Sequence, residues 1–235
     1  MQTVFITAAS GHIGSKLIPL LLQTPTTKLV LPTTNAARLT SSLPNSGLIT
    51  IVEGSIQDPQ WVETQLKAHN VDTVFLCLTR TDELLTTLNI FSVLKRTPSM
   101  KHIVYLSACG DFLSLATSGR LNGWKAAHGV VKLPVELALR ELCQESGFTS
   151  TVLGLTLFFD NDMRQKMGIL KDGVYPEPLG KKGASRVSTD DIAEAVRIAV
   201  LDQGEKWDGK KIMVGSRKRY TVSDIGYCGW NEADG

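Results

Sequence analysis

The sequence has few cysteines, almost no net charge and no long hydrophobic run, and each absence argues against a class of protein. The four cysteines include no C-x-x-C pair, and no histidine stands at a zinc-finger interval, so neither a disulfide framework nor a structural metal site is expected. A net charge of +2 does not indicate the clustered basic surface that captures nucleic acid. No apolar run approaches the length of a membrane span, so we expect no membrane partner and a cytoplasmic protein.

The sequence does contain a regular alternation of apolar and amphipathic segments. Hydrophobic residues make up 43% of the 235 residues, enough for a well-buried core in one domain, with or without a small lobe. Predicted strands cover residues 2–7, 28–31, 48–52, 71–78 and 102–107. Predicted helices cover residues 16–22, 59–69 and 82–95, and residues 36–43 are expected to form a short helix or a loop. Alternation at this spacing is typical of βαβ units, and right-handed crossovers then give a doubly wound parallel sheet of the Rossmann-like α/β class.

The alternation becomes less regular in the second half of the chain. Residues 108–123 are rich in Gly, Ser and Thr, and we expect them to form an exposed loop over the carboxyl ends of the strands. The predicted elements that follow are a helix at 133–146, a strand at 149–157, a helix at 192–201 and a strand at 211–214.

Two glycines occupy the first turn of the first βα unit, in the stretch Ala8-Ala-Ser-Gly-His-Ile-Gly14. Gly11 lets the backbone approach a pyrophosphate, and Gly14 lets the helix pack close to the strand. The helix N-terminus adds free N–H groups and positive potential. A tight turn without a ligand is the alternative, but the position in the first βα unit favours a dinucleotide. The predicted contacts from this turn are Thr7, Ser10, Gly11, His12, Ile13 and Gly14.

The segment after the second predicted strand bears on the choice between NAD(H) and NADP(H). No Asp or Glu stands there to accept a ribose 2′-hydroxyl. Thr34, Asn35 and Arg38 could instead bind a 2′-phosphate, and we therefore favour NADP(H) over NAD(H). An ordinary solvated helix residue is the alternative for Arg38.

The chain resembles the NmrA-like group of atypical short-chain dehydrogenases. The matching stretches, in chain order, are FITAASGHIG, VEGSIQD, IVYLSACG, KLPVE, ESGFTSTVL and RVSTDDIAEAV. The resemblance implies a Rossmann core at residues 1–153 and a small C-terminal substrate lobe at 154–235, which also holds returning elements of the core. Ser55 stands where the family places an Asp near the adenine. Together with Leu78 and Thr79, it completes the predicted cofactor contacts.

The resemblance also identifies candidate catalytic residues. The Tyr-x-x-x-Lys of typical short-chain dehydrogenases is His128-x-x-x-Lys132 here. The family position of Lys132 implies contact with the nicotinamide ribose and the substrate oxygen. The alternative is a surface lysine just ahead of a helix that begins near Pro134. His128 could transfer a proton near neutral pH, or be a packed or solvent-facing histidine.

The remaining candidates would line a substrate pocket. Ser107, at the end of the fifth predicted strand, could donate to a substrate carbonyl or cap the loop behind it. Trp124, Phe158 and Phe159 are expected to form apolar walls, with core packing as the alternative. The pocket implies a small-molecule substrate, and a homodimer is left open.

Three functions fit these residues. The first is an NADP(H)-dependent oxidoreductase acting on a small, largely apolar or aromatic carbonyl or enone. The second is a non-catalytic regulator that senses the dinucleotide. The third is an isomerase, cyclase or dehydratase that keeps the fold but has lost or repurposed the cofactor. The glycine turn and Lys132 favour the first, and the missing tyrosine favours the other two.

Overall fold

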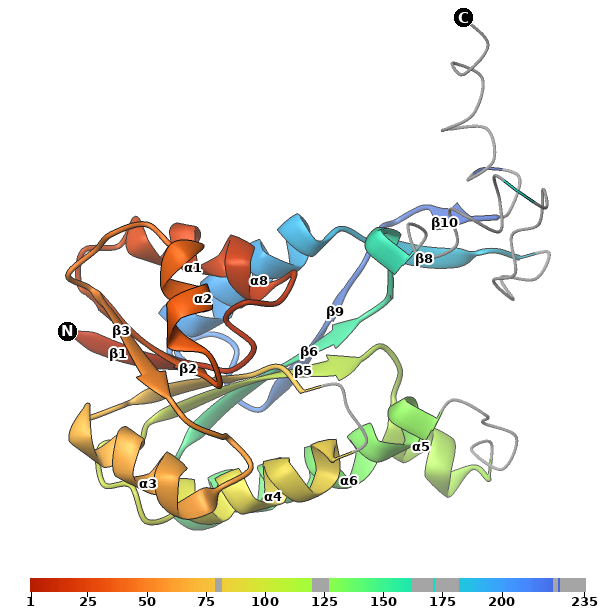
Figure 1. Ribbon diagram of the computed structural model, residues 1–235. Helices are drawn as coiled ribbons and strands as arrows, with labels where there is room; N and C mark the ends of the chain where they lie inside the picture. The colour runs from red at the N-terminus through yellow and green to blue at the C-terminus, as the bar shows by residue number, and fades with distance from the viewer. Residues whose placement is uncertain (79–81, 120–126, 162–170, 172–181, 222–223, 225–235) are drawn as a thin grey trace, which may run out of the picture.

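A computed structural model describes residues 1–78, 82–119, 127–161, 171, 182–221 and 224, with only the backbone described at 127–129. Its centre is a seven-stranded sheet in the order β3-β2-β1-β4-β5-β6-β9 (Figure 1). All neighbouring strands of this sheet are parallel, which confirms the predicted doubly wound α/β fold. The strands are β1 (Gln2–Ile6), β2 (Thr27–Thr33), β3 (Ile49–Glu53), β4 (Thr73–Leu76), β5 (His102–Ala108), β6 (Thr149–Leu155) and β9 (Lys210–Val214).

Helices cover both faces of this sheet (Figure 1). One face carries α1 (Gly14–Leu22), α2 (Ala36–Ser41) and α8 (Thr189–Asp202). The other carries α3 (Pro59–Ala68), α4 (Glu83–Leu94) and α6 (Ala127–Ser146). The strand order reverses between β1 and β4, and the crevice outside the carboxyl ends of strands at such a point is the usual ligand site of this architecture.

A second, smaller sheet is built from β7 (Leu157–Phe158), β8 (Ala184–Val187) and β10 (Arg219–Tyr220). It lies beyond the carboxyl ends of β5 and β6 (Figure 1). Sequence analysis did not predict β8 or β10, because strands this short carry no readable alternation. All three strands come from residues 154–235, the segment expected to form the substrate lobe. The division after residue 153 stays a prediction.

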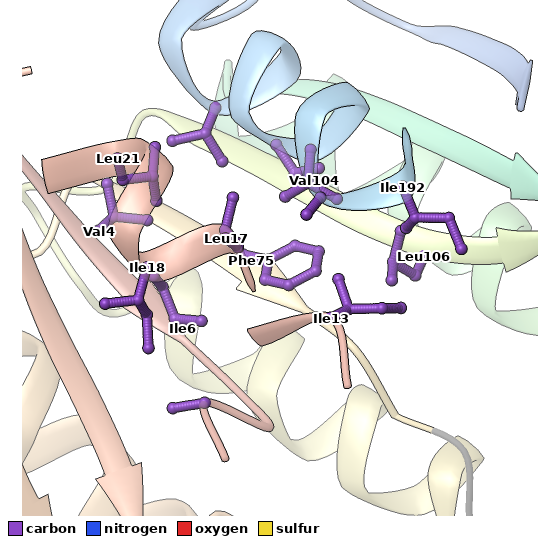
Figure 2. Close-up of a cluster of buried hydrophobic side chains, with 14 of the residues drawn as sticks. Val4, Ile6, Ile13, Leu17, Ile18, Leu21, Phe75, Val104, Leu106 and Ile192 are labelled. Atoms are coloured by element: carbon purple, nitrogen blue, oxygen red, sulfur yellow. The ribbon is translucent and has the colours of Figure 1, made fainter. Parts of the chain in front are cut away.

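Two layers of apolar side chains hold the helices onto the central sheet. Along β1, Val4 and Ile6 belong to one layer and Phe5 to the other, as the alternation of side chains along a strand requires. Figure 2 shows the first layer, where Leu17 of α1 and Ile192 of α8 lie over the sheet. Fully burying one such side chain contributes roughly 1.5–3 kcal/mol, so these layers fix the helices that frame the site.

Helix α6 begins at Ala127, earlier than the predicted residue 133, and Pro134 lies inside it. Lys132 is therefore part of the helix and does not precede it, which corrects the alternative considered for this lysine. A proline inside a helix removes one backbone hydrogen bond. Val135 and Leu139 are buried against the core on the same helix, and their burial offsets that loss.

The segment 108–123, expected to be a loop, contains the short helix α5 (Phe112–Thr117). Asp111 begins this helix, because its Oδ1 accepts a hydrogen bond from the backbone N–H of Ser114 at 3.0 Å. The buried ring of Phe112 anchors its first turn. The prediction missed α5 because a single buried residue gives no helical periodicity.

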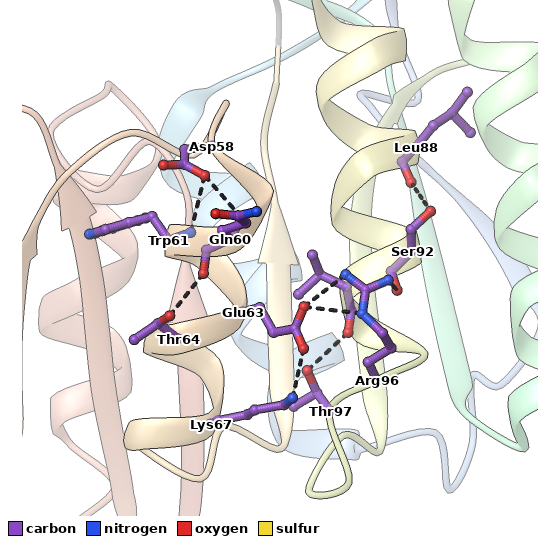
Figure 3. A network of polar contacts seen from close by, with 11 residues as sticks. Asp58, Gln60, Trp61, Glu63, Thr64, Lys67, Leu88, Ser92, Arg96 and Thr97 are labelled. Atoms are coloured by element: carbon purple, nitrogen blue, oxygen red, sulfur yellow. Dashed lines mark hydrogen bonds and ion pairs between the residues drawn. The ribbon is translucent and has the colours of Figure 1, made fainter.

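Polar contacts join α3 to the end of α4 on the face away from α1 (Figure 3). The Glu63 carboxylate accepts hydrogen bonds from Arg96 Nη2 at 2.7 Å and from Lys67 Nζ at 2.6 Å. These two bonds, of which that from Arg96 has the larger effect, lower the pKa of Glu63 to about 2.

Within the described part of the chain, no helix is long and apolar enough to cross a membrane.

Candidate functional site

The turn between β1 and α1 lies at the carboxyl end of β1, beside the reversal of strand order. Ala8 has a φ of 54°, in the left-handed region that glycine adopts most easily. A Cβ atom at Gly14 would lie 2.3 Å from the carbonyl oxygen of Ala8 and 2.7 Å from that of Ala9. The turn therefore requires glycine at residue 14. A Cβ at Gly11 would lie 3.1 Å from the Ala8 oxygen, so this position is less constrained.

The same turn carries backbone N–H groups that are free to bind an anion. Among the described residues, the N–H groups of Ser10, His12 and Ile13 have no hydrogen-bond acceptor. They stand at the N-terminus of α1, where the helix dipole adds positive potential. Such a turn fits a diphosphate, as predicted from the sequence.

Thr7 fixes the turn to the neighbouring strand. Its hydroxyl donates to the carbonyl oxygen of Phe75 at 3.1 Å and accepts from the N–H of Cys77 at 2.8 Å. The side chain is fully buried. The predicted cofactor contact at Thr7 is thus placed beneath the turn, where its hydroxyl is already hydrogen-bonded to β4. Burial raises the pKa of the Cys77 thiol to about 11, although the nearby charge of Lys132 opposes this shift.

The predicted 2′-phosphate site lies where β2 enters α2. Asn35 caps α2, because its Oδ1 accepts a hydrogen bond from the N–H of Arg38 at 2.9 Å. Thr34 and Arg38 are exposed. The structure adds an acidic residue that sequence analysis missed: Glu53 Oε2 accepts a hydrogen bond from the N–H of Ala36 at 2.9 Å. Glu53 belongs to β3, so only the pairing of β2 with β3 reveals its position here.

Ser55 and Leu78 follow β3 and β4. The Ser55 hydroxyl oxygen accepts from the N–H of Gln57 at 3.2 Å, which shapes the turn before α3. Gly54 is required beside it, since a Cβ there would lie 2.1 Å from the Trp61 ring. Leu78 is half-buried at the carboxyl end of β4. Thr79, the other contact predicted here, lies outside the described residues.

Lys132 is buried, with 6% of the residue exposed. Its Nζ lies 2.5 Å from Glu83 Oε1, 3.0 Å from the Leu106 carbonyl oxygen and 3.4 Å from that of Leu78. Tyr105 donates to the same Glu83 oxygen at 2.9 Å. Burial, and then the charge of Glu83, raise the pKa of Tyr105.

These contacts use all three ammonium protons of Lys132 inside the protein. They join the carboxyl ends of β4 and β5 to the start of α4. Lys132 therefore lies at the carboxyl ends of β4 and β5, but donation to a ligand would require breaking an internal hydrogen bond. Sequence analysis missed Glu83 and Tyr105. An acid at a helix start and a tyrosine within an apolar strand were the available signals.

Ser107, at the carboxyl end of β5, donates a short hydrogen bond to Glu136 of α6. Glu136 also accepts from Lys211 Nζ of β9 at 2.7 Å. Lys211 donates to the carbonyl oxygen of Gly110 at 2.7 Å as well. The predicted role of Ser107 toward a substrate carbonyl would require its hydroxyl to turn away from Glu136. Glu136 was quoted in a family motif, but its partners could not be inferred from spacing.

The other predicted pocket residues are placed only in part. His128 lies in α6, one turn before Lys132, with its side chain outside the description, and Trp124 lies outside the described residues. Phe158 packs partly buried against the core beneath α1 and α8, which supports the core alternative for this residue. The Phe159 ring lies in the small sheet, 5.1 Å from the Tyr220 ring in an edge-to-face arrangement.

The described residues bring together no group of three or more His, Cys, Asp or Glu side chains that could hold a metal ion. The site they form is a set of strand ends with a glycine turn for a diphosphate and two internally bonded polar clusters, Glu83–Lys132–Tyr105 and Ser107–Glu136–Lys211. The residues around the turn fit a nicotinamide dinucleotide.

Comparison with known proteins agrees with this geometry. Residues 8–203 match the sequence model of a family described as NAD(P)H-binding. A search among curated proteins gives no match.

The solved structures similar to this chain include three enzymes. One is UDP-glucose 4-epimerase from Thermotoga maritima, at 16% identity and a TM-score of 0.70, covering 95% of this chain and 80% of that one. Another is the Bordetella bronchiseptica enzyme WbmF with NAD⁺, at 16% identity and a TM-score of 0.72, covering 96% of this chain and 76% of that one. A third is dTDP-glucose 4,6-dehydratase from Bacillus anthracis with NAD, at 14% identity and a TM-score of 0.73, covering 96% of this chain and 79% of that one. At such identities the likeness shows the fold alone, a Rossmann-type sheet with flanking helices.

Proposed function

Because this chain belongs to the NAD(P)H-binding family, we propose that it is a nicotinamide-dinucleotide-dependent oxidoreductase. Its substrate would be a small, largely apolar or aromatic carbonyl or enone compound. The observation that carries the proposal is the β1–α1 turn, with free N–H groups at Ser10, His12 and Ile13 and an obligatory glycine at residue 14. The dinucleotide, when bound, supplies the hydride.

The chain's own residues would bind and orient the cofactor. The free N–H groups of the turn would donate to the diphosphate, and the helix dipole of α1 adds to their attraction. The Thr7 hydroxyl fixes the turn to β4, so the donors are held in place before a ligand arrives. Lys132 fixes the ends of β4 and β5 to each other, next to that turn.

Proton transfer to the substrate falls to His128 in this proposal. Lys132 and Ser107 already donate their protons inside the protein, to Glu83 and Glu136 respectively. His128 stands in α6, one turn before Lys132, at the position of the tyrosine in the familiar Tyr-x-x-x-Lys pattern. An imidazole can donate or accept a proton near neutral pH.

The preference for NADP(H) stays a prediction. The exposed guanidinium of Arg38 supports it, since an arginine can pair with a 2′-phosphate. The carboxylate of Glu53 at the same turn weighs against it. Arg38 therefore predicts tighter binding of NADPH, and Glu53 predicts weaker binding.

A specific observation also favours a second function, a regulator that binds the dinucleotide without chemistry. Two of the three polar groups expected to act on a substrate, Lys132 and Ser107, are bonded within the protein. The similar structures named as epimerase and dehydratase keep a third function open, isomerisation or dehydration on the same fold. The three functions differ in what loss of the glycine turn would do. The oxidoreductase and the regulator would lose dinucleotide binding, whereas an isomerase or dehydratase without the cofactor would keep its activity.

Cofactor binding is tested by titrating NADH and NADPH into the purified protein and following nicotinamide fluorescence. Gly11→Asp places a negative charge against the diphosphate and should abolish binding without unfolding the protein. The matched control is Gly47→Asp in an exposed loop, where a Cβ meets nothing within 4 Å. Equal affinities in the parent and Gly11→Asp would remove this turn from the proposal.

Chemistry is tested with a panel of quinones, enones and aldehydes, assayed both by nicotinamide absorbance and by product chromatography. A reductase oxidises the reduced cofactor in step with product, and His128→Phe lowers that rate and changes its pH profile. A regulator consumes no cofactor, yet binds it. An isomerase or dehydratase forms product without net oxidation of the cofactor.

A further inference from the structure

Glu53 is the last residue of β3 and lies opposite Thr33, the last residue of β2, in the parallel sheet. Its side chain is exposed and reaches over the neighbouring turn, where Oε2 accepts the N–H of Ala36 at 2.9 Å. A carboxylate from β3 therefore stands at the carboxyl end of β2. In this architecture the adenosine ribose binds at that end of the second strand.

Three backbone donors that could bind a 2′-phosphate at this turn already have partners. The N–H of Asn35 donates to Thr33 Oγ1 at 3.1 Å. The N–H of Ala36 donates to Glu53, and that of Arg38 donates to the Asn35 side chain at 2.9 Å. To use these donors, a phosphate would have to displace the oxygens that they already bind. A phosphate also carries a charge of about −1.5 to −2 and would be repelled by the Glu53 carboxylate at the same turn.

A ribose 2′-hydroxyl meets the opposite situation, because it is a donor. Glu53 Oε2 is held by Ala36, while Oε1 has no hydrogen bond to a described residue. One oxygen anchors the carboxylate and the other remains available to accept from the hydroxyl. Hydrogen bonds to a charged acceptor are about twice as strong as neutral ones.

We infer that Glu53 makes this protein bind NAD(H) in preference to NADP(H), by accepting the adenosine ribose hydroxyl and repelling a 2′-phosphate. The inference rests on the proposed function, in that a nicotinamide dinucleotide must bind at the β1–α1 turn. Glu53, on the adjacent strand β3, replaces the acidic residue that is absent after β2.

Arg38 is the residue that opposes this preference. Its guanidinium forms no ion pair with a carboxylate in the part of the chain that the structure describes. Pairing with a phosphate would order a long exposed side chain, which costs conformational entropy. Glu53 is already anchored to the backbone of α2, so its contribution requires less ordering.

The test compares dissociation constants of NADH and NADPH, measured by nicotinamide fluorescence at low ionic strength. The parent protein should bind NADH about tenfold more tightly, as expected for a hydrogen bond to a charged group. Glu53→Gln keeps an oxygen for the N–H of Ala36 but removes the charge, so the two constants should become similar. Glu53→Lys should reverse the preference. Arg38→Ala removes the opposing guanidinium and should increase the parent's preference for NADH.

Tighter binding of NADPH by the parent overturns the inference while leaving the proposed function intact. The same holds if Glu53→Gln and Glu53→Lys, both folded by thermal unfolding, keep the parent's ratio of constants. Absence of binding to either dinucleotide overturns the proposed function and the inference together. A preference for NADH that shrinks as salt is added supports the electrostatic part of the inference.

Discussion

Lys132 and Glu83 form an ion pair almost completely inside the protein, with side chains 8% and 3% exposed. The two residues lie on neighbouring helices, α6 and α4, and meet below the carboxyl ends of β4 and β5. Tyr105 adds a hydroxyl donor to the same carboxylate oxygen. Each charge compensates the other where water does not reach, so the pair is sensitive to the loss of either partner.

Lys132→Met should destabilise the protein by about 3–5 kcal/mol, because it leaves the Glu83 carboxylate buried without its partner. Urea unfolding measures the loss. Adding Glu83→Gln to Lys132→Met should restore part of the stability, since no charge then remains unpaired. The matched control is Lys95→Met, whose partner Glu145 is half exposed, and it should cost less than about 1 kcal/mol. Equal losses of stability at the two lysines would show that the buried ion pair contributes no more than the exposed one.

Ala8→Gly should stabilise the fold, because Ala8 holds a φ of 54° that disfavours a side chain. The expected gain is roughly 0.5–1 kcal/mol, the strain of a left-handed residue less the added freedom of glycine in the unfolded chain. Ala37→Gly in the exposed part of α2 is the control, and it should lose about the same amount. Thermal unfolding compares both variants with the parent, and a destabilised Ala8→Gly would contradict the strain argument.

Much of the fold could be predicted from the sequence, because local patterns encode it. The apolar runs of β1 and β5 and the need for a small residue at Gly14 depend on neighbours along the chain. The position of Glu53 could not be predicted in this way, since it depends on the pairing of β2 with β3. The burial of Lys132 was missed for a similar reason: its partner Glu83 is distant in sequence, and a lysine gives no sign of being buried.

The strands of the small sheet show a further limit. β8 and β10 are too short for an alternating pattern, and their pairing is settled only by the three-dimensional arrangement. Helix α6 shows the reverse case, in which a strong local rule was overridden. Pro134 predicts a helix start, yet the helix continues through it, because the half-buried Val131 before it and the buried Val135 and Leu139 after it pack against the core.

Gly14→Ala should disturb the turn that we assign to the diphosphate. The added methyl group would lie 2.3 Å from the Ala8 carbonyl oxygen, which is part of the backbone and cannot simply rotate away. We expect a loss of about 1–3 kcal/mol in stability, as for other overpacked sites, together with weaker dinucleotide binding. Gly47→Ala, with nothing within 4 Å of its added Cβ, is the control. Unchanged stability and affinity in Gly14→Ala would mean that the turn relaxes freely.

His102 gives the protein a pH-dependent stability. It is fully buried at the start of β5, and its Nδ1 lies 2.7 Å from Thr149 Oγ1. Burial lowers the pKa of His102 from its usual 6.5, and this effect outweighs the backbone of Ala199 and the charge of Asp202, which act in the other direction. The native protein therefore keeps this imidazole neutral at pH values where an unfolded chain would protonate it.

The sign of the effect follows from that difference. Above pH 6.5 both states hold a neutral imidazole, and the contribution to stability is complete. As the pH falls below 6.5, the unfolded chain takes up a proton that the native state does not bind, so stability falls by up to about 1.4 kcal/mol per pH unit until the native pKa is reached.

Urea unfolding at pH 7.5, 6.5 and 5.5 should show this decline in the parent. His102→Gln should be less stable at pH 7.5 but should decline less steeply, because its side chain takes up no proton. His69→Gln, at a half-buried histidine, controls for the titration of carboxylates common to all three proteins. If His102→Gln and the parent decline in parallel while His69→Gln does not differ from either, the buried imidazole is not the group that responds to acid.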